Sequence, residues 1–395
     1  MSNKVVVAGV GMIPFTKPGA SDNYPTMGAN AARAALADAG LDYALVEQAY
    51  AGYVFGDSTS GQAAIYGVGL TGIPVINVNN NGATGSTALF LARQAVESSS
   101  VECALALGFE QTAPDALKSA YFDRPGPMER FVKTMGHVQG TDNDAPRAAQ
   151  FFGGAARAYL REYGILPDTL GRIAVKARQH AANNPFAVFR DPVTLDEVMA
   201  SPMVFDPLTR LQCCPPTCGA AAAIVCSDAF ARRHGLDPRV AILAQSMTTD
   251  RNSTFDEADM RKVVGLDMTR AAARQVYEKA GVDPVDIDVV ELHDCFTANE
   301  LLSYEGLGLT PEGTAERFIR DGENTYGGRV VTNPSGGLLS KGHPLGATGL
   351  AQCAELVWQL RGTAQQRQVE GARLALQHNL GLGGACVVTL YERLS

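Results

Sequence analysis

The segment Asn79–Ser86, with the sequence Asn-Asn-Asn-Gly-Ala-Thr-Gly-Ser, has the pattern of a turn that presents a reactive group. The β-branched run Ile73–Val78 before it predicts a strand, and the alanine- and leucine-rich run Ser86–Ser98 after it has helical spacing. The first residues of such a helix present backbone N–H groups and the positive end of the helix dipole, which favour a thiolate or an oxyanion. Gly82 occupies this point and has no side chain. The turn is therefore predicted to favour negative charge without supplying a nucleophile.

Three side chains in the second half of the sequence are suited to acid–base chemistry. His293 and Cys295 follow an apolar run that ends at Leu292, and His343 lies just before Gly346-Ala347-Thr348-Gly349. An imidazole exchanges protons near neutral pH, and a thiol with an ordinary pKa of about 8.5 does so when its surroundings adjust that pKa. A single histidine after a strand often only packs or caps, but these three groups all lie where strands end or helices begin. We therefore expect them to form one acid–base site.

The elements that would position these groups alternate between short apolar strands and helices. This alternation predicts an α/β protein with mostly buried sheets. The expected strands are Lys4–Val10, Ile73–Val78, Glu102–Gly108, Ala220–Val225, Val240–Ala244, Val285–Leu292, Leu374–Gln377 and Ala385–Tyr391. The expected helices include Asn30–Ala39, Ser86–Ser98, Met268–Ala280 and Gly349–Leu360. Residues 114–211 carry many prolines, arginines and aromatic residues but few strand signals, so we expect an inserted domain that caps the core.

An internal repeat divides the rest of the chain into two halves. Gly82-Ala83-Thr84-Gly85 and Gly346-Ala347-Thr348-Gly349 each open a predicted helix, and each half begins with an apolar strand. Two similar halves are expected to pack together at these glycine turns. The predicted units are an N-terminal half of residues 1–113 and 212–236, an inserted domain of residues 114–211, and a C-terminal half of residues 237–395.

Length and composition are those of a folded, acidic protein. The 395 residues are 46% hydrophobic and 19% charged, which is enough for two or three cores and too apolar for a disordered chain. The formal net charge is −8 and no lysine and arginine run is present, so nucleic-acid binding is not expected. No stretch of about 18 uncharged apolar residues occurs, and the N-terminal segment lacks the apolar core of a signal peptide. Since the eight irregularly spaced cysteines also form no disulfide framework, we expect a cytoplasmic protein without a membrane span.

Four separated motifs resemble those of the thiolase superfamily. They are Asn79–Gly85, His293–Phe296, Asn333–Gly349 and Gln377–Gly381, in this order. Together they are similar to the sterol-carrier-protein type of thiolase, also known as lipid-transfer protein, over essentially the whole chain. The resemblance implies a five-layered αβαβα thiolase fold, built from two duplicated halves with an inserted loop domain and usually found as a homodimer. It also implies an acyl-CoA substrate and no permanently bound cofactor.

The resemblance implies a role for each matching residue. In the family, the cysteine of an Asn-Asn-Asn-Cys turn forms an acyl-enzyme, and Gly82 occupies its position here. His343 matches the histidine that activates this cysteine and helps bind a thioester oxygen, and His293 matches a polar residue of the same oxyanion hole. Cys295 matches the acid–base thiol of this branch. Gly381 matches the glycine whose N–H forms a second oxyanion hole with the N–H of residue 82.

The other cysteines are expected to be structural. Cys213, Cys214 and Cys218 lie close together in the sequence, but prolines intervene and the spacing is not that of paired zinc ligands, so no metal site is expected. Other thiolases keep an acid–base cysteine near the C-terminal glycine loop, and the matching position here is Asn379. Cys386 belongs to the strand that follows.

Coenzyme A leaves no distinct fingerprint in this sequence. Arg124, Arg130 and Lys133 of the insertion are candidates for a phosphate contact, but charges with this spacing usually form a solvated face. The residues that contact coenzyme A are therefore not assigned from the sequence.

The glycine at position 82 leaves three interpretations of the activity open. Thiolysis of a 3-oxoacyl-CoA needs a covalent thioester, and neither Thr84 nor Ser86 obviously replaces the thiolate, so thiolysis is expected to be abolished or weak. The retained acid–base set favours a 3-oxoacyl-CoA thiolase, or acetyl-CoA acyltransferase, lineage with a disabled nucleophile. The second interpretation is a retro-aldol lyase for a 3-hydroxyacyl-CoA, which needs a base and an oxyanion site but no acyl-enzyme; such relatives in steroid side-chain degradation typically work with an OB-fold partner. The third is a non-catalytic CoA-ester-binding protein.

Overall fold

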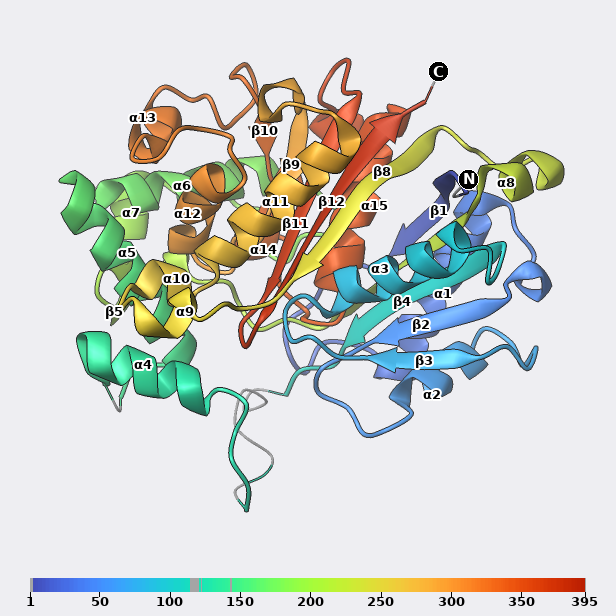
Figure 1. The fold of residues 1–395 in the computed structure, drawn as a ribbon, viewed down its shortest axis with the longest axis horizontal. Coiled ribbons are helices and arrows are strands. Elements are labelled where there is room, and N and C mark those ends of the chain that lie inside the picture. Colours follow the sequence, from blue (N-terminus) through green and yellow to red (C-terminus); the bar gives the residue numbers. More distant parts are fainter. Residues whose placement is uncertain (1–2, 114–120, 122, 143, 395) are drawn as a thin grey trace.

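Most of the described strands form one mixed sheet at the centre of the molecule (Figure 1), and β5 and β6 pair separately. The computed structural model describes residues 3–113, 121, 123–142 and 144–394. Within them the strands of this sheet follow the order β10-β9-β11-β12-β8-β1-β7-β4-β2-β3. Their bounds are β1 Val5–Met12, β2 Gln48–Gly52, β3 Val75–Val78, β4 Cys103–Glu110, β7 Gly219–Ser227, β8 Val240–Thr248, β9 Val289–Glu291, β10 Val331–Thr332, β11 Leu374–Gly381 and β12 Ala385–Arg393.

The strand order repeats from the middle of the sheet outwards. On one side it is β1-β7-β4-β2-β3, and on the other it is β8-β12-β11-β9-β10. The directions of pairing also repeat, since the first three strands of each set are antiparallel and the last three are parallel. Val6 opposite Ala241 is the pair of residues that joins the two sets. The repeated topology agrees with the duplication expected from the two Gly-Ala-Thr-Gly turns.

Four long helices and the two sets of strands form five layers. The helices are α1 Tyr24–Ala39, α3 Thr84–Glu97, α11 Leu266–Ala280 and α15 Thr348–Arg361. Alternate residues of β1 show the packing, because Val7 belongs to the core that contains α3 and α15, whereas Val6 belongs to the core beneath α1. In the second set, α11 packs over the face of the strands turned away from α15. The order α1, strands, α3 with α15, strands, α11 confirms the expected αβαβα fold.

The two glycine turns meet between the sets of strands, as the repeat predicts. A Cβ built on Gly85 would lie 2.8 Å from the Gly346 carbonyl oxygen and 2.9 Å from the Gly349 nitrogen. A Cβ on Gly349 would in turn overlap the backbone nitrogen of Ser86. Only glycine permits this approach, and it brings the N-termini of α3 and α15 together.

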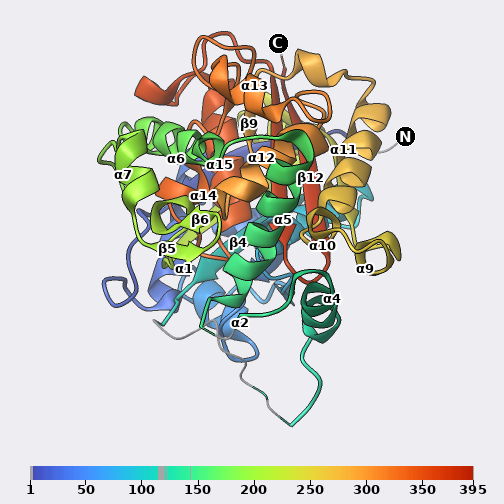
Figure 2. The same ribbon diagram turned by 90° about the vertical axis from the view of Figure 1, so that its left-hand side faces the viewer.

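Helices rather than strands dominate the inserted segment, which lies beside the second set of strands (Figures 1 and 2). Its elements are α4 Glu129–Gln139, α5 Arg147–Tyr163, α6 Asp168–Ala181, α7 Leu195–Ala200 and the short strands β5 Met203–Phe205 and β6 Leu208–Thr209. Phe152 of α5 stacks on Phe296 with ring centroids 4.9 Å apart, so the insertion contacts the segment of Cys295 directly. The predicted boundary at residue 114 lies outside the described residues.

Shorter helices complete the two halves and connect their strands. They are α2 Ser60–Tyr66 and α8 Asp228–His234 in the first half, and α9 Ser253–Asp256, α10 Met260–Val263, α12 Thr297–Gly306, α13 Ala315–Arg320 and α14 Gly337–Ser340 in the second. The part of the chain that the structure describes contains no helix of the length and hydrophobicity needed to cross a membrane.

One expected strand was wrong over most of its length, and others differ in extent. Residues 285–292 were expected to be extended, but Pro284–Asp286 forms a 3₁₀ helix capped by the Asp283 side chain, and β9 begins only at Val289. Strands β2 and β10 were not expected. Strand β11 continues to Gly381, four residues beyond its expected end, and thereby carries Asn379 and Gly381 to the glycine turn of the first half.

Candidate active site

Gly82 lies buried at the corner between β3 and α3, facing two histidines of the second half. The corner is held by backbone bonds from the Ala83 and Thr84 N–H groups to the Asn80 and Asn81 carbonyls. A Cβ built on Gly82 would lie 3.4 Å from Nε2 of His343 and 3.1 Å from Cε1 of His293. The structure therefore brings Gly82, His293 and His343 together, and any side chain at position 82 would point at both imidazoles.

The ring of His343 presents an unprotonated nitrogen to this point. Its Nδ1 lies 2.7 Å from Oγ1 of Thr348, and the Thr348 hydroxyl donates its own proton to the Pro344 carbonyl oxygen at 3.0 Å. With the hydroxyl proton of Thr348 directed at the Pro344 carbonyl oxygen, Nδ1 of His343 donates to Oγ1 of Thr348, and Nε2 retains its lone pair. The Thr217 hydroxyl, 2.7 Å from the His343 backbone N–H, fixes the loop that carries the ring. His343 is therefore set up as a base.

The ring of His293 has the opposite arrangement. Nδ2 of Asn379 lies 3.0 Å from Nδ1 of His293 and 2.9 Å from the Gly82 carbonyl oxygen. An amide NH₂ only donates, so Nδ1 of His293 accepts and its Nε2 carries the proton. The two histidine rings stand edge to face with centroids 4.9 Å apart. Nε2 of His343 and Cε1 of His293, the ring carbon next to its protonated Nε2, thus lie beside the same position.

Burial keeps these imidazoles neutral. It lowers the pKa of His343 to about 3 and the pKa of His293 well below 6.5, with the nearby His343 and His378 adding to the effect on His293. His378, whose Nδ1 accepts the His293 backbone N–H at 3.4 Å, also has its pKa lowered to about 3 by burial. All three rings are therefore uncharged near pH 7, the state in which a histidine can act as a base or as a neutral hydrogen-bond donor.

The hairpin between β11 and β12 forms the wall opposite the Gly82 corner. The Leu380 carbonyl oxygen lies 2.6 Å from the point where a Cβ of Gly82 would stand. Gly381 lies so close to Asn80 that a Cβ there would overlap the Asn80 carbonyl oxygen, and it would lie 3.1 Å from the Ala83 nitrogen. The Asn81 amide group ties the corner to this hairpin by donating to the Leu382 carbonyl oxygen at 2.8 Å. Gly381 therefore lies beside the turn, and its role in an oxyanion hole stays a prediction.

Cys295 is buried next to another thiol rather than in a described contact with the imidazoles. Its carbonyl oxygen accepts the Cys214 N–H at 2.9 Å, and among the described residues its thiol makes no hydrogen bond. Burial, together with Cys214 and Asp294, raises the pKa of Cys295 well above its usual range. The thiol is therefore protonated at neutral pH. Its role as an acid or base stays a prediction.

Two buried carboxylates hold the loops of the site in place. Asp294, between His293 and Cys295, accepts the Leu338 N–H of α14 at 2.7 Å. Glu110, at the end of β4, accepts the Gly346 N–H at 3.0 Å and so binds the second glycine turn to the first half. Burial raises the pKa of Glu110 to about 7. These carboxylates position the histidine loops from behind and do not themselves face Gly82 in the described contacts.

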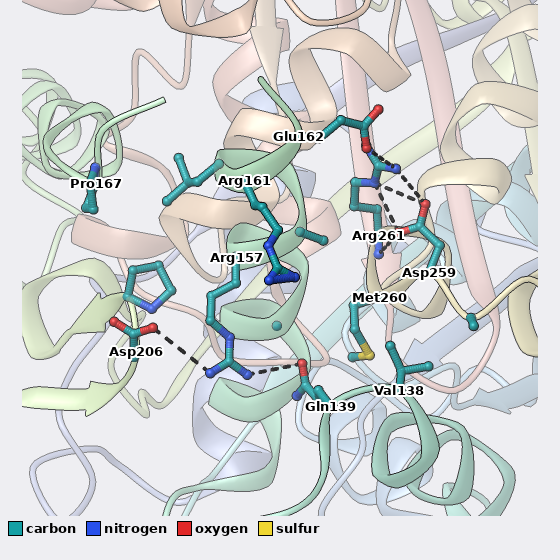
Figure 3. A pocket seen from close by; sticks show the side chains of 15 residues that line it. Val138, Gln139, Arg157, Arg161, Glu162, Pro167, Asp206, Asp259, Met260 and Arg261 are labelled. Carbon is teal, nitrogen blue, oxygen red and sulfur yellow. Dashed lines mark hydrogen bonds and ion pairs between the residues drawn. The ribbon is translucent and has the colours of Figure 1, made fainter. Parts of the chain in front are cut away.

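A separate cleft of about 880 Å³ lies between the inserted helices α4 and α5 and the segment before α10 (Figure 3). Arg157 there contacts Asp206 at 4.0 Å and Gln139 at 3.4 Å, and Arg261 pairs with Glu162 at 2.8 Å. Arg161 stands between these groups and has no ion pair or hydrogen bond with any described residue. The cleft therefore contains one cation that the described part of the protein does not neutralise.

The basic residues singled out in the sequence are partly engaged elsewhere. Arg124 pairs with Asp123 at 2.8 Å, and Arg130 lies over the ring of Phe255 at 3.9 Å. Neither lines the cleft that contains Arg161.

The sequence missed Asn379 and Thr348 as the groups that fix the protonation of the two rings. Thr348 carried a usable signal, because it is the threonine of the second Gly-Ala-Thr-Gly turn. Its counterpart Thr84 also bonds its own turn, donating to the Asn81 carbonyl oxygen at 2.6 Å and accepting the Asn80 N–H at 2.9 Å. Asn379 is the position that matches the acid–base cysteine of other thiolases, but its contacts with Gly82 and His293, which are distant in sequence, were not expected.

Comparison with known families accounts for nearly the whole chain. Residues 5–229 match the model of the thiolase N-terminal domain, and residues 250–391 match the model described as thiolase C-terminal domain-like. Sterol carrier protein 2 of Gallus gallus is 56% identical over 394 residues, covering 99% of this chain and 72% of that protein. Non-specific lipid-transfer protein-like 2 of Caenorhabditis elegans is 42% identical and covers 98% of this chain and 96% of that protein. Benzoylsuccinyl-CoA thiolase subunit BbsB of Thauera aromatica is 34% identical, with coverage of 97% and 96%.

Solved structures show the same fold. The structure described as Ltp2-ChsH2(DUF35) aldolase has a TM-score of 0.81 and 26% identity, covering 99% of this chain and 98% of that chain. Human mitochondrial 3-ketoacyl-CoA thiolase has a TM-score of 0.74 and 19% identity, covering 100% and 99%. The family models, the relatives and the strand order lead to one conclusion, that the chain belongs to the thiolase family.

Proposed function

We propose that the protein cleaves a carbon–carbon bond in an acyl-CoA ester without an acyl-enzyme, by retro-aldol cleavage of a 3-hydroxyacyl-CoA. The observation that carries this proposal is the side-chain-free position at Gly82, where a Cβ would lie 3.4 Å from Nε2 of His343 and 3.1 Å from Cε1 of His293. Thiolysis needs a nucleophile at that position, whereas a retro-aldol reaction needs only a base and an oxyanion donor. The structural neighbour with 26% identity is described as an aldolase, which supports the same choice.

In the proposed reaction, Nε2 of His343 removes the proton from the 3-hydroxyl group of the substrate. The oxygen becomes a carbonyl, the bond between C2 and C3 breaks, and its electron pair forms an enolate whose negative charge lies on the thioester oxygen. The N–H of His293 donates to that oxygen. The His343 imidazolium then returns the proton to C2, so an acyl-CoA and an aldehyde or ketone leave with all protons balanced.

Two helix N-termini support this charge development. Gly82 lies two residues before α3, and His343 lies five residues before α15, and both helices are 14 residues long. Their positive ends converge at the glycine turns, where they stabilise an enolate oxygen. The N–H groups of Gly82 and Gly381 are the proposed second set of donors. We further propose that Cys295 serves as a reserve proton donor, because burial keeps its thiol protonated.

A direct assay separates the three interpretations of Gly82. The parent protein is expected to convert a 3-hydroxyacyl-CoA into an acyl-CoA and a carbonyl product, and His343→Ala is expected to lower kcat by about 10²- to 10⁴-fold. Gly82→Cys is assayed beside the parent for thiolysis of a 3-oxoacyl-CoA. A parent that is inert on the hydroxy substrate, with thiolysis gained by Gly82→Cys, would replace the proposal with a thiolase lineage that has lost its nucleophile. If neither protein turns over but both bind CoA esters, the protein is a binding module.

We also propose a homodimer formed along the outer strand β3. Its outward edge is unpaired in the described sheet, and exposed apolar side chains lie nearby at Tyr66 and Leu70, the latter 79% exposed. An open edge with apolar neighbours is suited to pairing with a second chain. Light scattering is expected to give twice the chain mass of 41.7 kDa. If the protein is a retro-aldol lyase, we also propose an OB-fold partner protein. Addition of such a protein to the retro-aldol assay tests whether it is required.

A further inference from the structure

Asn379 is a buried amide that contacts both parts of the site at once. Strand β11 carries it into the space between the Gly82 corner and the ring of His293, and its side chain is fully buried. Nδ2 lies 2.9 Å from the Gly82 carbonyl oxygen and 3.0 Å from Nδ1 of His293. Its Oδ1 is buried without a hydrogen-bond partner among the described residues.

The orientation of this amide follows from the Gly82 carbonyl. If the amide were turned over, Oδ1 would face the Gly82 carbonyl oxygen, and two acceptors would stand against each other without a proton. Only Nδ2 can face that carbonyl. The Asn379 amide has this orientation although Oδ1 is left without a hydrogen-bond partner among the described residues. The two contacts of Nδ2 therefore determine how the side chain is placed.

The second proton of the same NH₂ group then has one described acceptor, Nδ1 of His293. Since Nδ1 must offer its lone pair, the neutral ring carries its proton on Nε2. The Gly82 carbonyl thus determines the orientation of the Asn379 amide, and the amide determines the tautomer of the His293 ring. We propose that Asn379 is a positioning residue that holds His293 as an Nε2–H hydrogen-bond donor beside Gly82. The catalytic use of that donor rests on the proposed function, whereas the tautomer does not.

The other described neighbours of His293 make no hydrogen bond to its ring nitrogens. His378 contacts the backbone N–H of His293 through its own Nδ1 rather than the ring, and the Asn299 amide group donates to the His293 carbonyl oxygen. His343 stands edge to face against the ring. Asn379 is therefore the side chain whose described hydrogen bond reaches a ring nitrogen of His293.

Nitrogen NMR of the parent protein tests the proposal without substrate. The chain has six histidines, so ¹⁵N-histidine labelling gives a small set of ring signals, and His293→Gln identifies the pair that belongs to His293. The expected result is a neutral ring with the proton on Nε2 and a lone pair on Nδ1. A neutral ring with the proton on Nδ1, or an imidazolium at pH 7, would overturn the proposal using only the folded parent.

Asn379→Asp tests the cause of the tautomer. A carboxylate only accepts, so Nδ1 of His293 is expected to become protonated, either as the other tautomer or as an imidazolium. The matched control is Asn81→Asp, which places the same charge in the adjacent corner, at a side chain that contacts Leu382 rather than the ring. The control is expected to keep the parent tautomer. An unchanged His293 signal in Asn379→Asp would refute the role of Asn379.

Kinetics add a readout that a purely structural role would not give. Loss of one oxyanion donor is expected to lower kcat by about 10²- to 10³-fold in Asn379→Asp, with little change in KM. A larger KM with unchanged kcat would contradict a positioning role. If the parent shows the expected tautomer but no retro-aldol activity, the proposed function fails and the assignment of Asn379 stands.

Discussion

Gly82→Ala tests whether the site has room for a side chain at position 82, where the resemblance to thiolases implies a nucleophile. The new Cβ would stand 2.6 Å from the Leu380 carbonyl oxygen, which is backbone of β11 and cannot rotate away. It would also stand 3.1 Å from Cε1 of the buried ring of His293. Overpacking a rigid site of this kind costs about 1–3 kcal/mol. The backbone of Gly82 is outside the left-handed region, so this cost is one of space alone.

The matched control is Gly126→Ala. Gly126 is exposed, is outside the left-handed region, and a Cβ there would meet nothing within 4 Å. Each substitution restricts the unfolded chain, which stabilises the protein by about 0.4–1 kcal/mol. This gain cancels between the two variants. The free energy of unfolding of Gly82→Ala is therefore expected to lie about 1–3 kcal/mol below that of Gly126→Ala.

Urea unfolding followed by the fluorescence of Trp358, the single tryptophan, measures this difference. Equal unfolding midpoints for the two alanine variants would refute the reasoning. They would show that the wall at Leu380 already accommodates a side chain at position 82. The site would then still be shaped for a nucleophile, and the interpretation as a thiolase lineage with a lost cysteine would gain over the retro-aldol proposal.

Two further predictions follow from the site and the cleft. Because burial lowers the pKa of His378 to about 3, the folded protein binds fewer protons than the unfolded chain below pH 6.5, so stability is full above that pH and is lost as the pH falls toward 3. His378→Asn is expected to reduce the slope of unfolding free energy against pH by about 1.4 kcal/mol per pH unit between pH 6 and 4, and parallel curves for parent and variant would contradict this. Arg161 lies nine residues along α5 from Phe152, about 13.5 Å at the rise of a helix, and makes no ion pair with a described residue, so we propose that its guanidinium binds a CoA phosphate. Arg161→Ala is expected to raise KM for the CoA ester about 10-fold with kcat unchanged, the loss typical of one charged hydrogen bond, whereas unchanged KM would remove the cleft from substrate binding.

Much of the fold is readable from the sequence, because buried strands next to helices leave long apolar runs. Strands β1, β4 and β12 and helices α11 and α15 begin and end within two residues of their expected bounds. The strand expected over residues 285–292 failed because a run of apolar residues hid a capped 3₁₀ turn.

The repeat would have corrected that error and revealed β2. Gly40-Leu41-Asp42 after α1 and Gly281-Val282-Asp283 after α11 are equivalent, and each aspartate caps a 3₁₀ helix that leads into a short strand. Those strands are β2 and β9. Their apolar runs are too short to stand out singly, and only comparison of the two halves identifies them.

Part of the candidate site could likewise be predicted from the sequence, and part could not. Gly82, His293, His343 and Gly381 lie in motifs whose residue types indicate chemistry, and the structure brings these four positions to one place. The protonation of the rings is a different matter, because it depends on which acceptor each neighbouring donor has already satisfied. The Thr348 hydroxyl donates to the Pro344 carbonyl oxygen, and the Gly82 carbonyl orients the amide of Asn379. The contacts of Thr348 are local and lie within the repeated turn, whereas those of Asn379 join segments that are distant in the sequence and leave no pattern along the chain.

The duplication explains why one base and one donor meet at a glycine. Each half contributes a helix N-terminus through the same Gly-Ala-Thr-Gly turn, and Gly85 and Gly349 let those turns touch. The first half then supplies the Gly82 carbonyl, which orients Asn379 and through it His293. The second half supplies the two histidine rings that face Gly82, His293 and His343. A cysteine at position 82 would add covalent chemistry, but the Gly82 carbonyl that orients Asn379 is present without it, so the proposed acid–base pair does not depend on a side chain at position 82.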